Sequence, residues 1–94
     1  MRFTWDENKN RRNKAKHGVS FEVAQRIFDD PFQLSLQDRH EGGEERWQTI
    51  GSVGGVVVLL VAHTYRVEGE EEVIRIISAR KATRQETTRY EQGH

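Results

Sequence analysis

The sequence predicts an α+β domain built on a mainly antiparallel sheet. Along the chain, the spacing of apolar residues changes from every second residue to every third or fourth, and then returns to every second residue. The strands expected in the second half follow one another through turns, with no helix between them. At 94 residues, the chain has the length of one small domain, which we expect to span residues 1–94.

A short strand and a polar helix are expected at the N-terminus. Residues 1–5 alternate polar and apolar side chains, which is typical of a strand. Asp6 suits an N-cap and Gly18 a C-cap, so the residues between them are predicted to be helical. Because Ala15 is the only aliphatic residue of this helix, burial of an apolar face cannot hold it in place.

Charge is segregated along the chain although its net value is zero. Residues 1–20 carry six basic and two acidic side chains, whereas residues 21–45 carry two basic and seven acidic ones. In the first helix, polar residues at helical spacing form one mainly cationic stripe: Lys9, Arg12, Asn13 and Lys16. Folding could gather such segments into an anion-binding surface, and the alternative is a solvated mosaic of charges.

A second helix and a strand follow the first helix. Ser20 is an N-cap for an amphipathic helix that ends before Pro31. Residues 32–37 then alternate as a strand with one apolar face, and residues 38–45 are expected to form a polar loop.

Three more strands and a final helix complete the predicted order β-α-α-β-β-β-β-α. The strands are expected at residues 46–53, 56–66 and 73–79. A tight turn at Gly54-Gly55 joins the first two of them. Thr83 and Glu86 have the spacing of a capping box, which begins a helix that reaches Tyr90.

The composition excludes several kinds of site. The chain has no cysteine, so it holds neither a disulfide nor a thiolate-ligated zinc. Its four histidines form no metal-binding motif, and we expect no metal and no cofactor. The longest apolar run has seven residues, whereas a bilayer span needs roughly 20. Since no apolar signal segment follows the first residues either, we expect a cytoplasmic protein that does not enter membranes.

Arginines near strand ends are the candidates for binding anions. If the strand that begins at Arg46 pairs across the Gly54-Gly55 turn with the strand that ends at Arg66, both arginines lie at the sheet end away from that turn. A guanidinium binds phosphate oxygens at two points and stays charged during a reaction. The alternative is that each arginine pairs with a neighbouring acidic residue.

Six segments, in this order and spacing, resemble the BrnT family of bacterial type II toxins. They are FTWDENK, KHGVSFEVA, IFDDP, DRHEGGEERWQTIG, HTYR and RIISARKATRQE, and together they extend over nearly the whole chain. The resemblance implies a compact RelE-like fold and a metal-independent endoribonuclease that inhibits translation and growth. It also implies a BrnA-like ribbon-helix-helix antitoxin, in a complex of two toxin and two antitoxin chains that reaches operator DNA only through the antitoxin.

The resemblance implies roles for particular residues as well. A RelE-like ribonuclease drives the 2′-hydroxyl of RNA onto the adjacent phosphate, which requires a base, an acid and cations but no cofactor. The cations would be Arg46, Arg66 and Arg80, and the base would be Glu45 or His40.

Other residues would complete this site or hold the RNA. His63, Tyr65 or His17 could complete the catalytic group, and Trp47 or Tyr65 could stack on a base. The RNA-binding residues would be Lys9, Asn13, Lys16, His17, Trp47, Tyr65 and Lys81.

Two other functions remain open at this point. One is a non-catalytic module that binds the antitoxin and helps to repress their operator. The other is a RelE-like fold redirected to a protein target such as a gyrase. Arginines at the positions that the resemblance assigns to the ribonuclease favour the enzyme.

Overall fold

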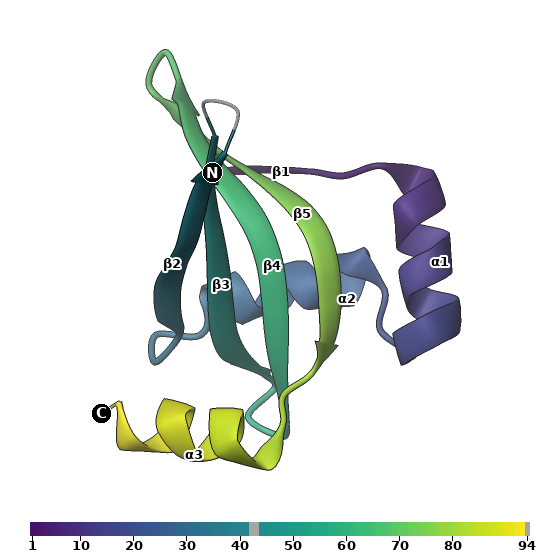
Figure 1. Cartoon of the computed structure of the whole chain (residues 1–94), viewed down its shortest axis with the longest axis vertical. Coiled ribbons are helices and arrows are strands. Elements are labelled where there is room, and N and C mark those ends of the chain that lie inside the picture. The colour runs from purple at the N-terminus through teal and green to yellow at the C-terminus, as the bar shows by residue number, and fades with distance from the viewer. Residues whose placement is uncertain (42–43, 94) are drawn as a thin grey trace.

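One five-stranded sheet organises the computed structural model, with the strand order β1-β5-β4-β3-β2 (Figure 1). The strands are β1 (Arg2–Thr4), β2 (Leu34–Glu41), β3 (Glu44–Val53), β4 (Val57–Glu68) and β5 (Glu71–Lys81). β1 is parallel to β5 and all other neighbours are antiparallel. The helices are α1 (Glu7–His17), α2 (Phe21–Ala24) and α3 (Arg84–Gln92), with a 3₁₀ helix η1 (Gln25–Asp29) after α2. The predicted α+β class with a mainly antiparallel sheet is confirmed.

The structure describes the backbone of residues 1–41 and 44–93, and the side chains of these residues except 39–41. Within this part of the chain, each of the three α-helices is too short or too polar to cross a bilayer.

The two faces of the sheet are covered differently. The first face packs against α1, α2 and η1, and its core includes Phe21, Ile27, Val61 and Ile76. At the second face, α3 crosses only the end of the sheet near the β3–β4 turn, where Tyr90 packs on Leu60 in a smaller cluster. In Figure 1, α2 lies behind the strands and α3 runs along their lower end. Among the described residues, no helix lies over the rest of the second face.

Two buried asparagines attach α1 to the rest of the fold. The amide nitrogen of Asn13 donates to the carbonyls of Val19 and Ala79, both at 2.8 Å, and its oxygen accepts the Ala79 N–H at 3.1 Å. The Asn10 side chain accepts the Phe21 N–H at 2.8 Å. Hydrogen bonds between buried groups therefore replace the apolar face that α1 lacks.

The helix ends agree with the capping residues expected from the sequence, and the second helix is only partly α-helical. Asp6 caps α1 at its start and Gly18 ends it with a left-handed φ of 72°. Ser20 accepts the Val23 N–H at the start of α2, as predicted. After Ala24, however, the chain tightens into the 3₁₀ helix η1.

The prediction of a polar loop at residues 38–45 is wrong for residues 38–41 and 44–45, and residues 42–43 lie outside the described part of the chain. β2 continues to Glu41 and β3 already begins at Glu44, with His40 opposite Glu45 in the ladder. These polar residues can form strands because the backbone hydrogen bonds between β2 and β3 need no apolar side chains. The turn at Gly54-Gly55 is where it was expected, and both glycines have positive φ, at 63° and 70°.

Candidate functional site

Four arginines of the strands β3, β4 and β5 share the second face of the sheet, which we call the arginine face. In the register, Arg46 of β3 lies opposite Thr64 of β4, and Thr64 lies opposite Arg75 of β5. Arg66 follows Thr64 by two residues, so its side chain leaves β4 on the same face. Arg80 is opposite Leu60, whose side chain contacts α3 on this face. On these strands the arginine face therefore carries Arg46, Arg66, Arg75 and Arg80. Arg2 of β1 lies at the edge of the same face, opposite Val73, and binds Glu68 and Glu71, both at 2.6 Å.

These arginines are not evenly spaced on the face. Arg46, Arg66 and Arg75 lie at the end of the sheet away from the Gly54-Gly55 turn, as expected for the first two. Arg80 is paired with Leu60, which lies six residues before Arg66 on β4. This separation corresponds to roughly 20 Å along the strand. Arg80 and Arg66 would therefore contact different phosphates of a bound polyanion.

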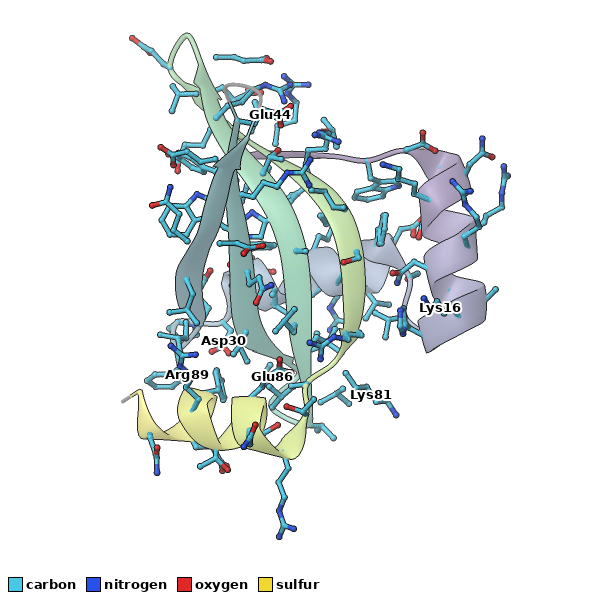
Figure 2. All side chains as sticks on the ribbon, viewed as in Figure 1. Lys16, Asp30, Glu44, Lys81, Glu86 and Arg89 are labelled. Atoms are coloured by element: carbon cyan, nitrogen blue, oxygen red, sulfur yellow. The ribbon has the colours of Figure 1, made fainter. Side chains whose placement is uncertain are left out.

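Each of three arginines on this face forms an ion pair with a glutamate. Arg66 binds Glu68 at 2.8 Å, and Arg75 binds Glu44 at 3.1 Å. Arg80 binds both carboxylate oxygens of Glu86, at 2.8 and 3.0 Å. Figure 2 shows Glu44 at the upper end of the sheet and Glu86 at its lower end. The pairing with neighbouring acids that the sequence left open is therefore present, and it also fixes where each guanidinium lies.

The arginines keep their partners ionised. The hydrogen bond from Arg75 lowers the pKa of Glu44, and the bond from Arg66 lowers that of Glu68. The pKa of Glu86 falls to about 2, mainly through its hydrogen bond from Arg80. In turn, the carboxylate of Glu86 raises the pKa of Arg80. Glu44, Glu68 and Glu86 are therefore ionised at neutral pH.

Glu45 and two of the predicted RNA-binding residues lie on the first face, away from the arginines. Glu45 pairs with Tyr65, and Trp47 pairs with His63. The indole N–H of Trp47 donates to Glu45 at 3.2 Å, and the hydroxyl of Tyr65 donates to Glu72 at 3.0 Å. In this structure Glu45 therefore lies on the face opposite to Arg46, because successive residues of a strand point to opposite faces.

A cavity of about 240 Å³ opens on this first face, between η1 and the sheet. Phe28, Trp47, His63 and Tyr65 are among its mainly apolar lining residues. His63 is 4% exposed, and its ring contacts Phe28 edge-on. Burial lowers the pKa of His63, which keeps the imidazole neutral at pH 7. His63 and Tyr65 therefore do not complete a group with the four arginines.

The residues predicted on the cationic stripe differ in their exposure. Lys9 and Lys16 are exposed on α1 and His17 is half-buried. Asn13 is buried, and backbone groups take up its amide, so it is not available to RNA. Lys81 is exposed, but it leaves β5 on the face opposite to its neighbour Arg80.

Arg75 and Arg2 are arginines of this face that the sequence reasoning missed. Arg75 stands between Ile74 and Ile76 in an otherwise apolar strand. This alternation of side chains in the sequence already indicated that Arg75 points away from the main core. His40 was a candidate base, and its side chain lies outside the described residues. In the described part of the chain, acidic and histidine side chains form no group that could hold a metal ion.

Comparisons with known proteins identify the family of this chain. Residues 5–86 match the model of a family described as the ribonuclease toxin BrnT of type II toxin–antitoxin systems. The crystal structure of the Brucella abortus ribonuclease toxin BrnT is similar, with a TM-score of 0.66 and 26% sequence identity. The match covers 89% of this chain and 99% of that one. A search of curated proteins gave no match. On the strength of the family match over residues 5–86, the chain belongs to the BrnT family of ribonuclease toxins of type II toxin–antitoxin systems.

Proposed function

We propose that this chain is the toxin of a type II toxin–antitoxin pair and cleaves RNA internally, without a metal ion, on the arginine face. One observation carries the proposal. Four arginines from three strands share the one sheet face that α1 and α2 leave open. Guanidinium groups are suited to the extra negative charge that a phosphate gains when a hydroxyl attacks it.

The reaction we propose is an internal transesterification. The 2′-hydroxyl of the nucleotide attacks the adjacent phosphorus, its proton passes to a base, and the 5′-oxygen leaves with a proton from an acid. Arg46, Arg66 and Arg75 would hold the reacting phosphate, and Arg80 would bind a more distant phosphate of the same strand. No step in this sequence requires a cofactor.

Glu44 is the better candidate for the base on geometric grounds. It belongs to the same face as Arg46 and accepts hydrogen bonds from Arg75 at 3.1 and 3.3 Å, whereas Glu45 is on the opposite face. Its lowered pKa keeps it ionised and therefore able to accept a proton, although the same shift makes it a weaker base. Lys9 and Lys16 on α1 would bind RNA that leaves the face across β5.

Product analysis tests the chemistry. Purified toxin is incubated with RNA in EDTA, and the ends of the fragments are identified by mass spectrometry. We expect cleavage to persist and to leave 2′,3′-cyclic phosphate or the 3′-phosphate derived from it. Activity that disappears in EDTA and returns with magnesium indicates a two-metal type of nuclease and rejects the proposal.

The partner we propose is a BrnA-like antitoxin with a ribbon-helix-helix part, in a complex of two toxin and two antitoxin chains. Membership of a type II toxin family supports an antitoxin partner. Expression of this chain alone in a bacterial cytoplasm should stop growth, and the antitoxin of the same operon should restore it. The antitoxin should also raise the melting temperature of the toxin as its concentration rises, because it binds the folded state.

A second candidate function is a non-catalytic module that binds the antitoxin in operator repression. The ion pairs of Arg66, Arg75 and Arg80 with glutamates favour it, since such pairs can be purely structural. Growth that continues normally with soluble, folded protein supports this alternative. We further propose that the fold is RelE-like, a label supported by two N-terminal helices on one face of an antiparallel sheet and an open face opposite them.

A further inference from the structure

A groove of about 320 Å³ lies on the first face of the sheet, remote from the arginine face. It is formed where α1 joins α2 and where β4 and β5 reach the end of the sheet. Its floor includes Val23, Val57 and Leu59, and Lys14 and Lys81 are at its sides. We call it the valine groove. Figure 2 shows Lys81 at this end of β5, away from the carboxylate of Glu86.

Folding leaves apolar side chains of the valine groove in contact with water. Val23 is 40% exposed and Val57 is 39% exposed. Val56, which precedes Val57 at the turn, is 84% exposed. Turn positions are ordinarily occupied by polar residues, and neighbouring exposed apolar side chains commonly mark a surface that a protein partner covers.

The charge beside these valines is mainly positive. Lys81 is exposed and, among the described residues, its ammonium group forms no ion pair. Lys14 is also exposed and lies near Glu22, which is not among the lining residues of the groove. A partner segment that fits this surface presents apolar side chains to the valines and carboxylates to the lysines.

The lining of the groove favours protein over RNA. Single-stranded RNA is held by aromatic rings that stack on bases and by arginine forks on phosphates. The groove contains neither an aromatic residue nor an arginine among its described lining residues. Valines offer RNA no comparable contact, whereas they match an aliphatic side chain of a protein.

We propose that the antitoxin implied by the toxin family docks an acidic, apolar segment in the valine groove. This proposal rests on the family assignment and is independent of the proposed ribonuclease chemistry. Since the strand alternation directs Lys81 and Arg80 to opposite faces of β5, the segment in the groove does not itself cover Arg80. Antitoxin binding and RNA cleavage should therefore be separable by substitution.

The experiment measures the affinity of the purified toxin for the full-length antitoxin of its operon by calorimetry. Lys14→Glu and Val57→Ser should each weaken binding about tenfold or more, with the Lys14 effect reduced at high salt. Arg84→Glu is the matched control, because Arg84 is an exposed cation on α3 that lies outside the groove. Thermal melting checks that each variant is folded, and Val23→Ser on α2 replaces Val57→Ser if the latter alters the melting curve.

RNA cleavage and oligomeric state are measured on the same variants. The proposal is supported if the groove variants lose antitoxin affinity, keep the cleavage rate of the parent and remain insensitive to the antitoxin in cells. Unchanged affinity overturns it. Variants that lose RNA cleavage but keep their antitoxin affinity also overturn it, because the groove is then an RNA site. Variants that lose a toxin dimer overturn it as well, because a second copy of the toxin then occupies the groove. If the parent toxin does not cleave RNA but the groove variants still lose antitoxin affinity, only the proposed ribonuclease activity is rejected.

Discussion

Arg80 and Glu86 form a two-point ion pair that joins the arginine face to α3. The two terminal nitrogens of Arg80 lie 2.8 and 3.0 Å from the two carboxylate oxygens of Glu86. The same carboxylate accepts the N–H of Thr83 at 2.8 Å, which closes the capping box at the start of α3. Glu86 therefore closes the helix cap with Oε1 and holds the guanidinium of Arg80 with both of its oxygen atoms.

The first prediction concerns acid stability. Folding lowers the pKa of Glu86 from 4.5 to about 2, mainly through the bond from Arg80. A carboxylate whose pKa falls on folding stabilises the protein fully above the unfolded value, and this contribution is lost as the pH falls through the folded value. Between pH 4.5 and 2, the melting temperature of the parent should fall more steeply than that of Glu86→Gln. Equal slopes in this window contradict the ion pair.

The second prediction separates catalysis from folding on the arginine face. Arg66, Arg75 and Arg80 are only half-buried, so replacing one with alanine should leave the protein folded. For Arg66 and Arg75, loss of a cation at the reacting phosphate should lower the rate of RNA cleavage by about 100-fold to 1,000-fold. Loss of Arg80, which would bind another phosphate, should mainly weaken the binding of RNA. The measurements are thermal melting and cleavage rate for each variant.

A core substitution provides the control for this series. Ile76 is 1% exposed, and Ile76→Ala should cost about 2 to 5 kcal/mol of stability. If the arginine variants melt as early as Ile76→Ala, their ion pairs are structural and the assignment of the site is wrong. If they melt like the parent and still cut RNA at its rate, the active site lies elsewhere.

The third prediction compares two adjacent carboxylates on opposite faces of β3. Glu44 lies beside Arg75, whereas Glu45 accepts the indole N–H of Trp47. If Glu44 is the base, Glu44→Gln should reduce cleavage at saturating RNA by about 100-fold or more, and Glu45→Gln should reduce it much less. The reverse order returns the role to Glu45 and requires β3 to change its pairing when RNA binds.

Capping and turn residues predicted much of this fold because they act locally. Asp6, Gly18, Ser20 and the Gly54-Gly55 turn fix element ends through interactions within a few residues, and all of them function as expected. The prediction of a loop at residues 38–45 failed because the strands there depend on pairing with a separate segment rather than on local interactions. This pairing joins β2 to β3 through backbone groups, which leave no hydrophobic pattern in the sequence.

The candidate site was predicted less well than the fold. Its residues were grouped by the resemblance to a family, and the alternation of side chains between the two faces of each strand was not applied to them. Arg46 and Arg66 were placed correctly at one sheet end, since the turn determines their register. Alternation alone puts Glu45 on the face opposite to Arg46, and it directs Lys81 away from Arg80. The burial of Asn13 was beyond such reasoning, because it depends on Ala79, 66 residues away in the chain.

The fourth prediction concerns the attachment of α1. Asn13→Ala removes hydrogen bonds from three buried backbone groups, those of Val19 and Ala79, and each unsatisfied group costs about 1 to 3 kcal/mol. We expect a clear fall in melting temperature and faster hydrogen exchange in α1. Lys9→Ala on the exposed side of the same helix should change stability by less than about 0.5 kcal/mol. If both variants melt alike, the asparagine does not hold the helix.

The last prediction concerns His63 and the pH range just below neutrality. Its Nδ1–H donates to the Thr64 carbonyl at 3.1 Å, so in the neutral ring Nε2 accepts the hydroxyl of Thr49 at 2.7 Å. Burial lowers the pKa of His63 from 6.5. Between that value and the lower folded one, the unfolded chain binds more protons, so stability should be lost as the pH falls below 6.5.

In His63→Gln the amide oxygen can accept from Thr49 but does not titrate, so its stability should depend less on pH in this range. Chemical denaturation of parent and variant at a series of pH values from about 7 to 5 measures the difference. His17→Gln is the control and should keep the slope of the parent, because His63 is still present. A parent whose stability is constant over this range shows that the imidazole gains its proton without cost, and therefore that it is not the buried neutral ring described above.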